Sequence, residues 1–369
     1  MSWLEREAAL LKLGVKAQTL YAYVSRGQIS AQTHPDDPRA SLYSEIDIDR
    51  LVSRRRRGRS RSDIASAAIA WGDPVMETEI TTVREGRLIY RGIDAVKFAE
   101  QATIEETAAL LWQADPLKPV DLPRQSFVGQ SGKARAFNYL ATEAARGLAM
   151  PSQSPGDLVQ SGRQLLLGFA SAIAGTSGRG LFHQRLARYW TLDPDGVDML
   201  RRTLVLVADH ELNPSSFAAR VSASTGASLP ACALAGLSTL SGPRHGEAAM
   251  SAVSYLRSAL SGAPNTLSDP IPAIGHALYP NGDPRAKALL RSLKPPPNLK
   301  QAIRAAERKG GQPANIDMAL AALCLQFDLP DDAPFLIFAA GRMVGWIAHA
   351  MEQSQSGKTI RPRAKYLGG

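Results

Sequence analysis

Residues 335–346, FLIFAAGRMVGW, place one arginine, Arg342, inside the most apolar stretch of the chain, which continues to Met351. The stretch is short for a membrane span, so it is expected to form an interior helix. Apolar neighbours lie on several faces of Arg342, and a guanidinium there must find an anion, because unpaired burial of a charge is costly. The anion is either a protein carboxylate or a ligand.

The rest of the chain favours helix over sheet. Of 369 residues, 44% are apolar but only 6% aromatic, so the residues that suit strands are sparse. Strands and helices do not alternate and no repeat of fixed period is present, which argues against a doubly wound α/β fold and a solenoid. We expect an all-α fold with two short strands at 76–81 and 87–90. The predicted helices of the larger part cover 95–112, 134–148, 158–176, 195–211, 215–240, 246–261, 285–294, 298–309, 316–328 and 335–353.

Two cysteines, Cys232 and Cys324, lie far apart in apolar stretches, without the spacing of metal ligands. They are typical of small core residues in a reduced protein. The N-terminus mixes charges with apolar residues and lacks the continuous apolar segment of a secretory signal. These features predict a cytoplasmic protein with no membrane partner.

The first 53 residues have an organisation of their own. Short helices are expected at 5–12 and 16–26, a hairpin or wing at 28–40 and a third helix from 44. This arrangement resembles the winged helix-turn-helix of MerR and excisionase-type DNA-binding domains. The resemblance is carried by Leu13-Gly14-Val15, Thr19-Leu20-Tyr21, Tyr23-Val24, Arg26-Gly27-Gln28-Ile29 and Leu42-Tyr43-Ser44-Glu45-Ile46-Asp47.

The positive charge of the chain is concentrated at this end. Residues 1–62 hold twelve Lys and Arg against seven Asp and Glu, and residues 54–72 read as a basic linker. In the folds that the segment resembles, the second helix enters the major groove of duplex DNA while basic residues hold phosphates. The alternative is a three-helix cap that packs on the larger domain. The resemblance implies that these residues face DNA: Lys16, Gln18, Thr19, Tyr23 and Arg26.

Three of the six histidines, His210, His245 and His276, stand beside glycine, proline or acidic residues where helices begin or end. Loops held by a rigid scaffold are the usual place for catalytic groups, although one such histidine alone is more often structural. Asp317 opens an apolar helix, where an ordinary Asp stabilised by the helix dipole is the simpler interpretation. Three histidines, this Asp and Arg342 together favour a catalytic site.

Residues 73–369 resemble the citrate synthase family. The resemblance rests on six motifs in the family's order and on a seventh near the start of the region. In chain order they are Tyr90-Arg91-Gly92-Ile93-Asp94, Asp209-His210-Glu211-Leu212-Asn213, Gly242-Pro243-Arg244-His245-Gly246, Gly275-His276 with Asp283-Pro284-Arg285, Asn315-Ile316-Asp317, Gly341-Arg342, and Arg361-Pro362-Arg363.

The resemblance implies an all-helical homodimer of two-domain subunits, with a smaller mobile domain at roughly 245–330 and the site between the domains. It implies that Asp317 removes a proton from the methyl group of acetyl-CoA, that His245 binds the thioester oxygen, and that His276 polarises the carbonyl of oxaloacetate. It implies no metal and no permanent cofactor, with acetyl-CoA or propionyl-CoA as co-substrate. Further implied contacts are His210, Arg285, Arg342 and, across the dimer, Arg361 for the keto acid, and Arg308 and Lys309 for CoA.

Physical chemistry supports this division of labour. A carboxylate of ordinary pKa is too weak a base to ionise a thioester α-carbon alone, so Asp317 and His245 must act together. We expect the helix N-terminus to lower the pKa of Asp317, and dehydration on domain closure to restore its basicity. Planar arginines suit the carboxylates of the keto acid.

The chain departs from the family pattern near two histidines. Arg244 and Glu247 flank His245, where they either pair with each other or alter access for CoA, and Pro280 follows His276 where the family often has basic residues. The alternative function is a DNA-binding regulator whose synthase-like domain senses oxaloacetate, citrate or acyl-CoA. The retained base, Asp317, favours catalysis, because a sensor does not need it.

Overall fold

The computed structural model describes residues 3–25, 27–34, 37, 40–57, 76–116, 126–262 and 270–364. The chain divides into two compact units, 1–77 with 362–369 and 78–361. Most of the expected basic linker, 58–72, lies outside the described residues, and helix α3 extends to Arg57, beyond the expected boundary at residue 53.

The first unit contains three helices and a small antiparallel sheet in the order β1-β3-β2. Helices α1 (Arg6–Leu13) and α2 (Ala17–Ser25) are joined at Gly14, whose φ of 60° suits glycine. Strand β3 pairs with both β1 and β2 and leads directly into α3. The other elements are β1 (Trp3–Leu4), β2 (Ala31–Thr33), β3 (Ser41–Ser44) and α3 (Glu45–Arg57).

A separate apolar core holds this unit together. Ala9, Leu20, Ile29 and Ile48 are buried in it, with Tyr43 from β3. The core draws on all three helices and on the sheet, so the unit has the packed interior of a small domain.

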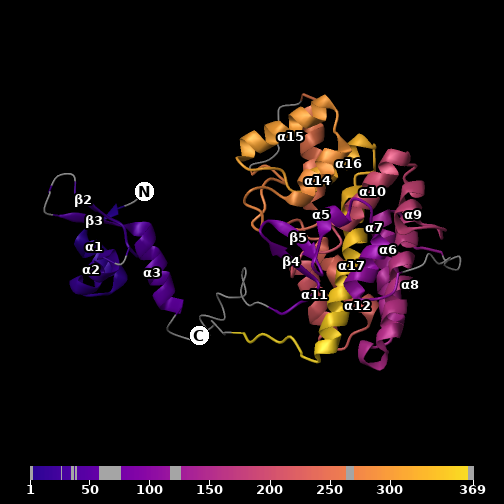
Figure 1. Cartoon of the computed structure of the whole chain (residues 1–369), viewed down its shortest axis with the longest axis horizontal. Helices are drawn as coiled ribbons and strands as arrows, with labels where there is room; N and C mark the ends of the chain where they lie inside the picture. Colours follow the sequence, from indigo (N-terminus) through magenta and orange to yellow (C-terminus); the bar gives the residue numbers. More distant parts are fainter. Residues whose placement is uncertain are drawn as a thin grey trace. The chain divides into compact units, whose positions relative to one another are not determined.

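The second unit begins with a three-stranded sheet in the order β4-β5-β6 and is otherwise helical (Figure 1). The strands are β4 (Thr81–Arg84), β5 (Arg87–Tyr90) and β6 (Ile93–Asp94). The helices are α5 (Ala95–Phe98), α6 (Ile104–Trp112), α7 (Gly132–Arg146), α8 (Pro155–Ala174), α9 (Phe182–Tyr189), α10 (Pro194–Leu206), α11 (Pro214–Ala223), α12 (Leu229–Leu240), α13 (Ala248–Leu260), α14 (Pro284–Leu293), α15 (Pro297–Gly310), α16 (Ile316–Gln326) and α17 (Ala333–Ser356), with a 3₁₀ turn at Met150–Ser152.

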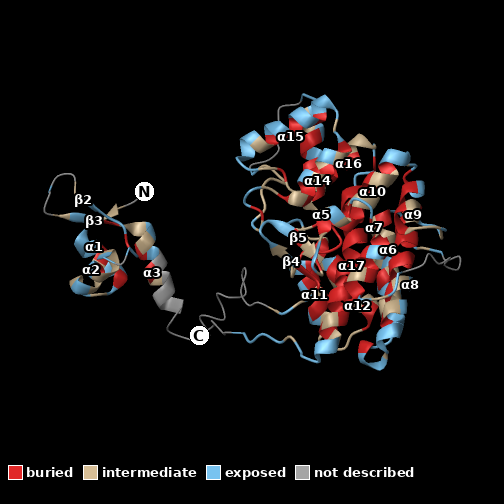
Figure 2. Cartoon of the chain, viewed as in Figure 1, coloured by how far each residue is buried: buried red, intermediate tan, exposed pale blue. Residues whose placement is uncertain are grey.

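Helix α17 is the core of this unit. Figure 2 shows it buried between the other helices, and it packs against α6, α8, α10, α11 and α12. At 24 residues it is longer than expected, and it is the one helix in the described part of the chain long and apolar enough to cross a membrane. Its apolar window is wholly buried inside the unit. Burial on all faces explains its uniformly apolar sequence.

The expected elements are present with three differences. Strands β1 and β6 were not expected, and the first strand of the second unit lies at 81–84 rather than at 76–81. The predicted helix 215–240 is two helices, because the chain turns at Gly226 with a φ of 79° and α12 starts anew before Pro230. Helix α9 was not expected, since its Arg and His residues interrupt any apolar run.

Candidate active site

The turn that begins α16 holds Asp317 beside the loop of His276. Asn315 caps the helix by accepting a hydrogen bond from the Asp317 amide at 3.0 Å, and its side chain donates to the Gly275 carbonyl at 2.9 Å, 40 residues away in sequence. Ile274 and Ala314 form an isolated antiparallel bridge between the two segments. Backbone pairing therefore brings the predicted base and one predicted histidine together.

The carboxylate of Asp317 is held in an unfavourable environment for its charge. Its Oδ1 is buried and has no hydrogen-bond partner among the described residues. Burial raises the pKa of Asp317 to about 7, with Asp283 acting in the same direction, although Arg285 and Arg342 oppose the rise. The expected lowering of this pKa is therefore wrong, because desolvation outweighs the helix N-terminus. A carboxyl group that titrates near neutrality is suited to proton transfer.

Arg285 lies in the first turn of α14 and is oriented by Asp283. The Asp283 carboxylate accepts two hydrogen bonds from the Arg285 guanidinium, at 3.0 and 2.8 Å, and one from the Ile316 amide at 3.1 Å. The same side chain caps α14 through the Arg285 amide. One buried carboxylate thus orients the guanidinium and ties it to the helix of Asp317. Asp283 belongs to one of the motifs of the family resemblance, but its sequence position did not predict this role.

Arg342 of α17 is 1% exposed, as its apolar surroundings predicted. Its Nε donates to the Val207 carbonyl at 2.9 Å, and Nη1 is buried without a hydrogen-bond partner in the described parts of the chain. Burial lowers the pKa of Arg342 to about 10, although Asp209 opposes this change. The guanidinium remains charged at neutral pH, with a donor available for an anion.

His210 and His276 meet at the same place. Their rings lie edge to face with centroids 5.0 Å apart, and Tyr279 bonds to His210 Nε2 through its hydroxyl at 2.9 Å. The Leu278 amide donates to His276 Nδ1 at 3.2 Å, so the neutral ring carries its proton on Nε2. Burial lowers the pKa of both histidines, with Arg285 acting in the same direction. Both rings are therefore neutral at pH 7.

His245 lies in the short turns before α13. Its Nε2 is 3.0 Å from Ser215 Oγ in the first turn of α11, and its ring is 6.0 Å from that of Phe338. Burial, with the charge of Arg342 acting in the same direction, lowers the pKa of His245 to about 4. The structure therefore brings together six predicted residues whose charges act on one another: His210, His245, His276, Arg285, Asp317 and Arg342.

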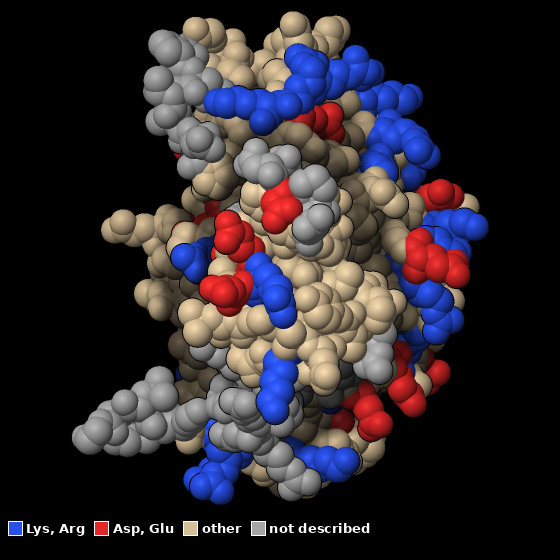
Figure 3. All heavy atoms as spheres, turned by 90° about the vertical axis from the view of Figure 1, so that its left-hand side faces the viewer, with Lys and Arg blue, Asp and Glu red and all other residues tan. Residues whose placement is uncertain are grey.

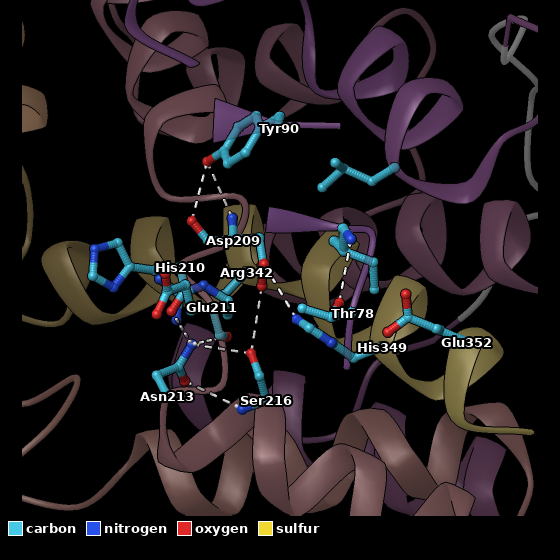
Figure 4. Close-up of polar contacts among 12 residues, drawn as sticks. Thr78, Tyr90, Asp209, His210, Glu211, Asn213, Ser216, Arg342, His349 and Glu352 are labelled. Carbon is cyan, nitrogen blue, oxygen red and sulfur yellow. Dashed lines mark hydrogen bonds and ion pairs between the residues drawn. The ribbon is translucent and has the colours of Figure 1, made fainter. Parts of the chain in front are cut away.

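Asp209, the residue before His210, forms a buried polar network that was not predicted from the sequence. Figure 4 shows its carboxylate between Ser216 and His349, at 3.4 Å from Ser216 Oγ and 3.2 Å from His349 Nε2. The Tyr90 hydroxyl accepts from the Asp209 amide and donates to the Val205 carbonyl. These contacts fix the loop that carries His210. The polar motif Asp209-His210 was the only local signal, because the partners lie far away in sequence.

The remaining predicted contacts of this unit are on the surface. Arg308 and Lys309 are exposed in the last turn of α15, a favourable position beside the helix dipole. Figure 3 shows Lys and Arg side chains along the top of the molecule, at the level of α15 in Figure 1. Arg361 is exposed after the end of α17. Glu247 pairs with Lys133 of α7 at 2.6 Å, where a pair with Arg244 had been one expectation.

In the first unit, the predicted DNA contacts differ in exposure. Lys16 and Gln18 are exposed, Thr19 is partly buried, and Arg26 lies outside the described residues. Tyr23 packs partly against the core, whereas Tyr21, which was not among the predicted contacts, is 49% exposed.

Comparison with known proteins gives consistent matches. The family described as "Citrate synthase, C-terminal domain" matches residues 69–169 and 171–363. Citrate synthase 2 of Bacillus subtilis is 34% identical over 200 residues. The matched region covers 47% of this chain and 52% of that protein. Citrate synthase of Haloferax volcanii is 26% identical over 77% of this chain and 90% of its own length. The 2-methylcitrate synthase of Shewanella oneidensis is 26% identical over 80% of this chain and 93% of its own length.

Among solved structures, a citrate synthase of Thermoplasma acidophilum in a ternary complex with carboxymethyl coenzyme A and oxaloacetate has a similar fold. It matches with a TM-score of 0.65 at 21% identity, over 80% of this chain and 94% of that one.

Proposed function

Because the chain belongs to the citrate synthase family, we propose that it condenses acetyl-CoA or propionyl-CoA with oxaloacetate, giving citrate or 2-methylcitrate and CoA. It is an acyltransferase of the citrate synthase type, with the acyl-CoA as co-substrate and no permanent cofactor. The relatives reported above are named as synthases and lend no support to a regulator that only senses these ligands.

The first step is enolisation of the thioester. Asp317, ionised above its raised pKa of about 7, takes a proton from the α-carbon of the acyl group. A neutral His245 donates a hydrogen bond to the thioester oxygen, where negative charge develops. Burial of Asp317 strengthens it as a base, because its charge is poorly stabilised before the reaction.

The second step forms the carbon–carbon bond. The enolate carbon attacks the keto carbon of oxaloacetate, and the developing alkoxide accepts a hydrogen bond from His276 Nε2–H, the tautomer that the Leu278 amide favours. The proton that Asp317 removed from the α-carbon is then returned to the alkoxide oxygen, which leaves a hydroxyl group and an ionised Asp317. The product is a thioester of the citryl-CoA type. Water then attacks its carbonyl carbon, CoA leaves as the free thiol, and the new carboxylic acid is released.

The arginines bind the carboxylates of the keto acid. Arg342 offers a buried Nη1 with no partner among the described residues, and a substrate carboxylate satisfies it. Arg285 is oriented by Asp283 for the same dianion, and His210 is oriented by Tyr279. Fixing the keto acid between these groups supplies the orientation that a two-substrate reaction needs.

The observation that carries this proposal is that two buried atoms, Asp317 Oδ1 and Arg342 Nη1, both lack a hydrogen-bond partner among the described residues. Neutral histidines lie in the same cluster. The test measures thiol release from acetyl-CoA and from propionyl-CoA with oxaloacetate, for the wild type and Asp317→Asn. We expect release from at least one acyl-CoA and a loss of about 100-fold or more in the variant, because general-base catalysis is removed. Equal rates for the two proteins would reject the role of Asp317.

The proposal includes a homodimer in which Arg361 completes the site of the partner. Two observations support it: Arg361 is exposed, and α11 exposes Phe217 and Val221 one helical turn apart, an apolar pair suited to a second copy. Mixing Asp317→Asn with Arg361→Ala tests it. Hybrid dimers then contain one intact site, so random mixing should restore about a quarter of the wild-type activity. No gain over the two separate variants would contradict a shared site.

For the first unit we propose winged helix-turn-helix DNA binding, with a domain boundary near residue 53. The support is the short turn at Gly14 between α1 and α2, the β2–β3 pair and the exposed Lys16 and Gln18. Binding of the full chain to duplex DNA should weaken steeply as salt rises, because phosphate contacts release counterions. Absent or salt-independent binding would leave the unit as a packing module.

A further inference from the structure

Gln353, near the end of α17, is 2% exposed and uses both ends of its amide. Its nitrogen donates to the Lys358 carbonyl at 2.8 Å and to Ser356 Oγ at 3.0 Å, and its oxygen accepts from Arg220 Nε at 2.9 Å. An amide with partners on both sides has one satisfactory orientation. The side chain therefore joins α11 to the segment that follows α17.

The segment after Gly357 is held at several points although it is exposed. Ser356 Oγ accepts from the Lys358 amide at 3.3 Å, and the Ile360 amide donates to Ser224 Oγ, at the end of α11, at 3.1 Å. A C-terminal segment with little burial normally frays unless it is tied down. Arg361 comes directly next and makes no hydrogen bond or ion pair within the part of this chain that the structure describes. These hydrogen bonds therefore hold the backbone before Arg361, whose guanidinium has no partner among the described residues of the same chain.

Charged groups anchor the other side of Gln353. Arg220, 3% exposed, donates to Glu352 Oε2 at 2.7 Å, and Glu352 Oε1 accepts from the Glu79 amide at 2.8 Å. Arg220 lies on α11, the helix that exposes Phe217 and Val221. The support for the C-terminal segment is therefore built on the same helix as the apolar pair that we assign to the dimer.

We infer that Gln353 is a positioning residue: it holds residues 358–360 so that Arg361 reaches the keto-acid site of the second subunit. This inference rests on the proposed function and on the shared site. If Gln353 only stabilised the end of α17, its removal would lower stability without acting through Arg361. Coupling between the two residues separates these possibilities.

The test is a double-mutant cycle on the full-length enzyme, with KM for oxaloacetate, kcat and thermal unfolding as readouts. The four proteins are the wild type, Gln353→Met, Arg361→Ala and the double variant. We expect Gln353→Met to raise KM for oxaloacetate about three- to tenfold, because that is the ratio to which the free energy of one hydrogen bond corresponds. In the Arg361→Ala background, the same substitution should leave KM unchanged. Unchanged KM, or equal effects of Gln353→Met in both backgrounds, would overturn the inference.

Two further variants keep the result interpretable. Ser224→Ala removes the tie to Ile360 at a partly exposed position and should reproduce the KM effect, even if Gln353→Met does not fold. Gln326→Met is the matched control, because Gln326 also lies at a helix end and donates to a backbone carbonyl, that of Leu293, at 3.0 Å. We expect its KM to be that of the wild type. An inactive wild type would reject the proposed function itself. An active wild type with an unaltered KM in Gln353→Met, or in Ser224→Ala if Gln353→Met does not fold, would reject only this inference.

Discussion

The carboxyl of Asp317, whose Oδ1 is buried without a partner in the described part of the chain, should lower the stability of the protein in a pH-dependent manner. Its pKa of about 7 in the folded state, against the ordinary 3.8, corresponds to about 4 kcal/mol of penalty on the ionised form. Between these two values the unfolded chain loses the proton that the folded chain retains. The unfolded state therefore binds fewer protons, and stability falls as pH rises from about 4 to about 7.

Asp317→Asn removes this titration. The variant should gain about 2–3 kcal/mol in free energy of unfolding relative to the wild type between pH 5 and pH 8, because most of the penalty develops in that interval. Urea unfolding of both proteins at pH 5, 6, 7 and 8 measures the difference, with Asp195→Asn at an exposed position as control. A constant difference across this range would refute the claim that the Asp317 carboxyl is desolvated.

Three other changes give separate expectations. Arg342→Lys should lower kcat/KM for oxaloacetate about 10- to 100-fold in steady-state kinetics, because lysine lacks the planar fork; an unchanged value would show that this side chain does not bind the keto acid. Tyr279→Phe should lower kcat about tenfold by leaving His210 Nε2 without its hydrogen bond, and full activity would remove Tyr279 from the site. Gly236→Ala should destabilise the protein by about 1–3 kcal/mol in thermal unfolding, because the new Cβ would lie 2.6 Å from the Trp346 ring; an unchanged midpoint would contradict that tight packing.

Local patterns predicted the parts of the structure that depend on local chemistry. The apolar run around Arg342 predicted a buried helix and a buried guanidinium, and both are present. The break at Gly226 was missed because alanines and serines on both sides suit a helix equally well. Helix α9 was missed because its burial comes from neighbouring helices rather than from an apolar run of its own.

The site was predictable as a set of residues but not as a set of contacts. Glycine- and acid-flanked histidines identified His210 and His276, yet their edge-to-face contact depends on loops that are 66 residues apart in numbering. The roles of Tyr279 and Asp283 arise only when α14, α16 and the loop after α10 meet. The pKa of Asp317 was predicted in the wrong direction, because its position at a helix start is visible in the sequence while its burial is not.

The most direct test of the account is the pH dependence of kcat/KM for the acyl-CoA, which reports the ionisation of the free enzyme. We predict an ascending limb with an apparent pKa of about 7, abolished in Asp317→Asn. A limb near 4, typical of a solvated carboxylate, would contradict the claim that the desolvated carboxyl of Asp317 is the base.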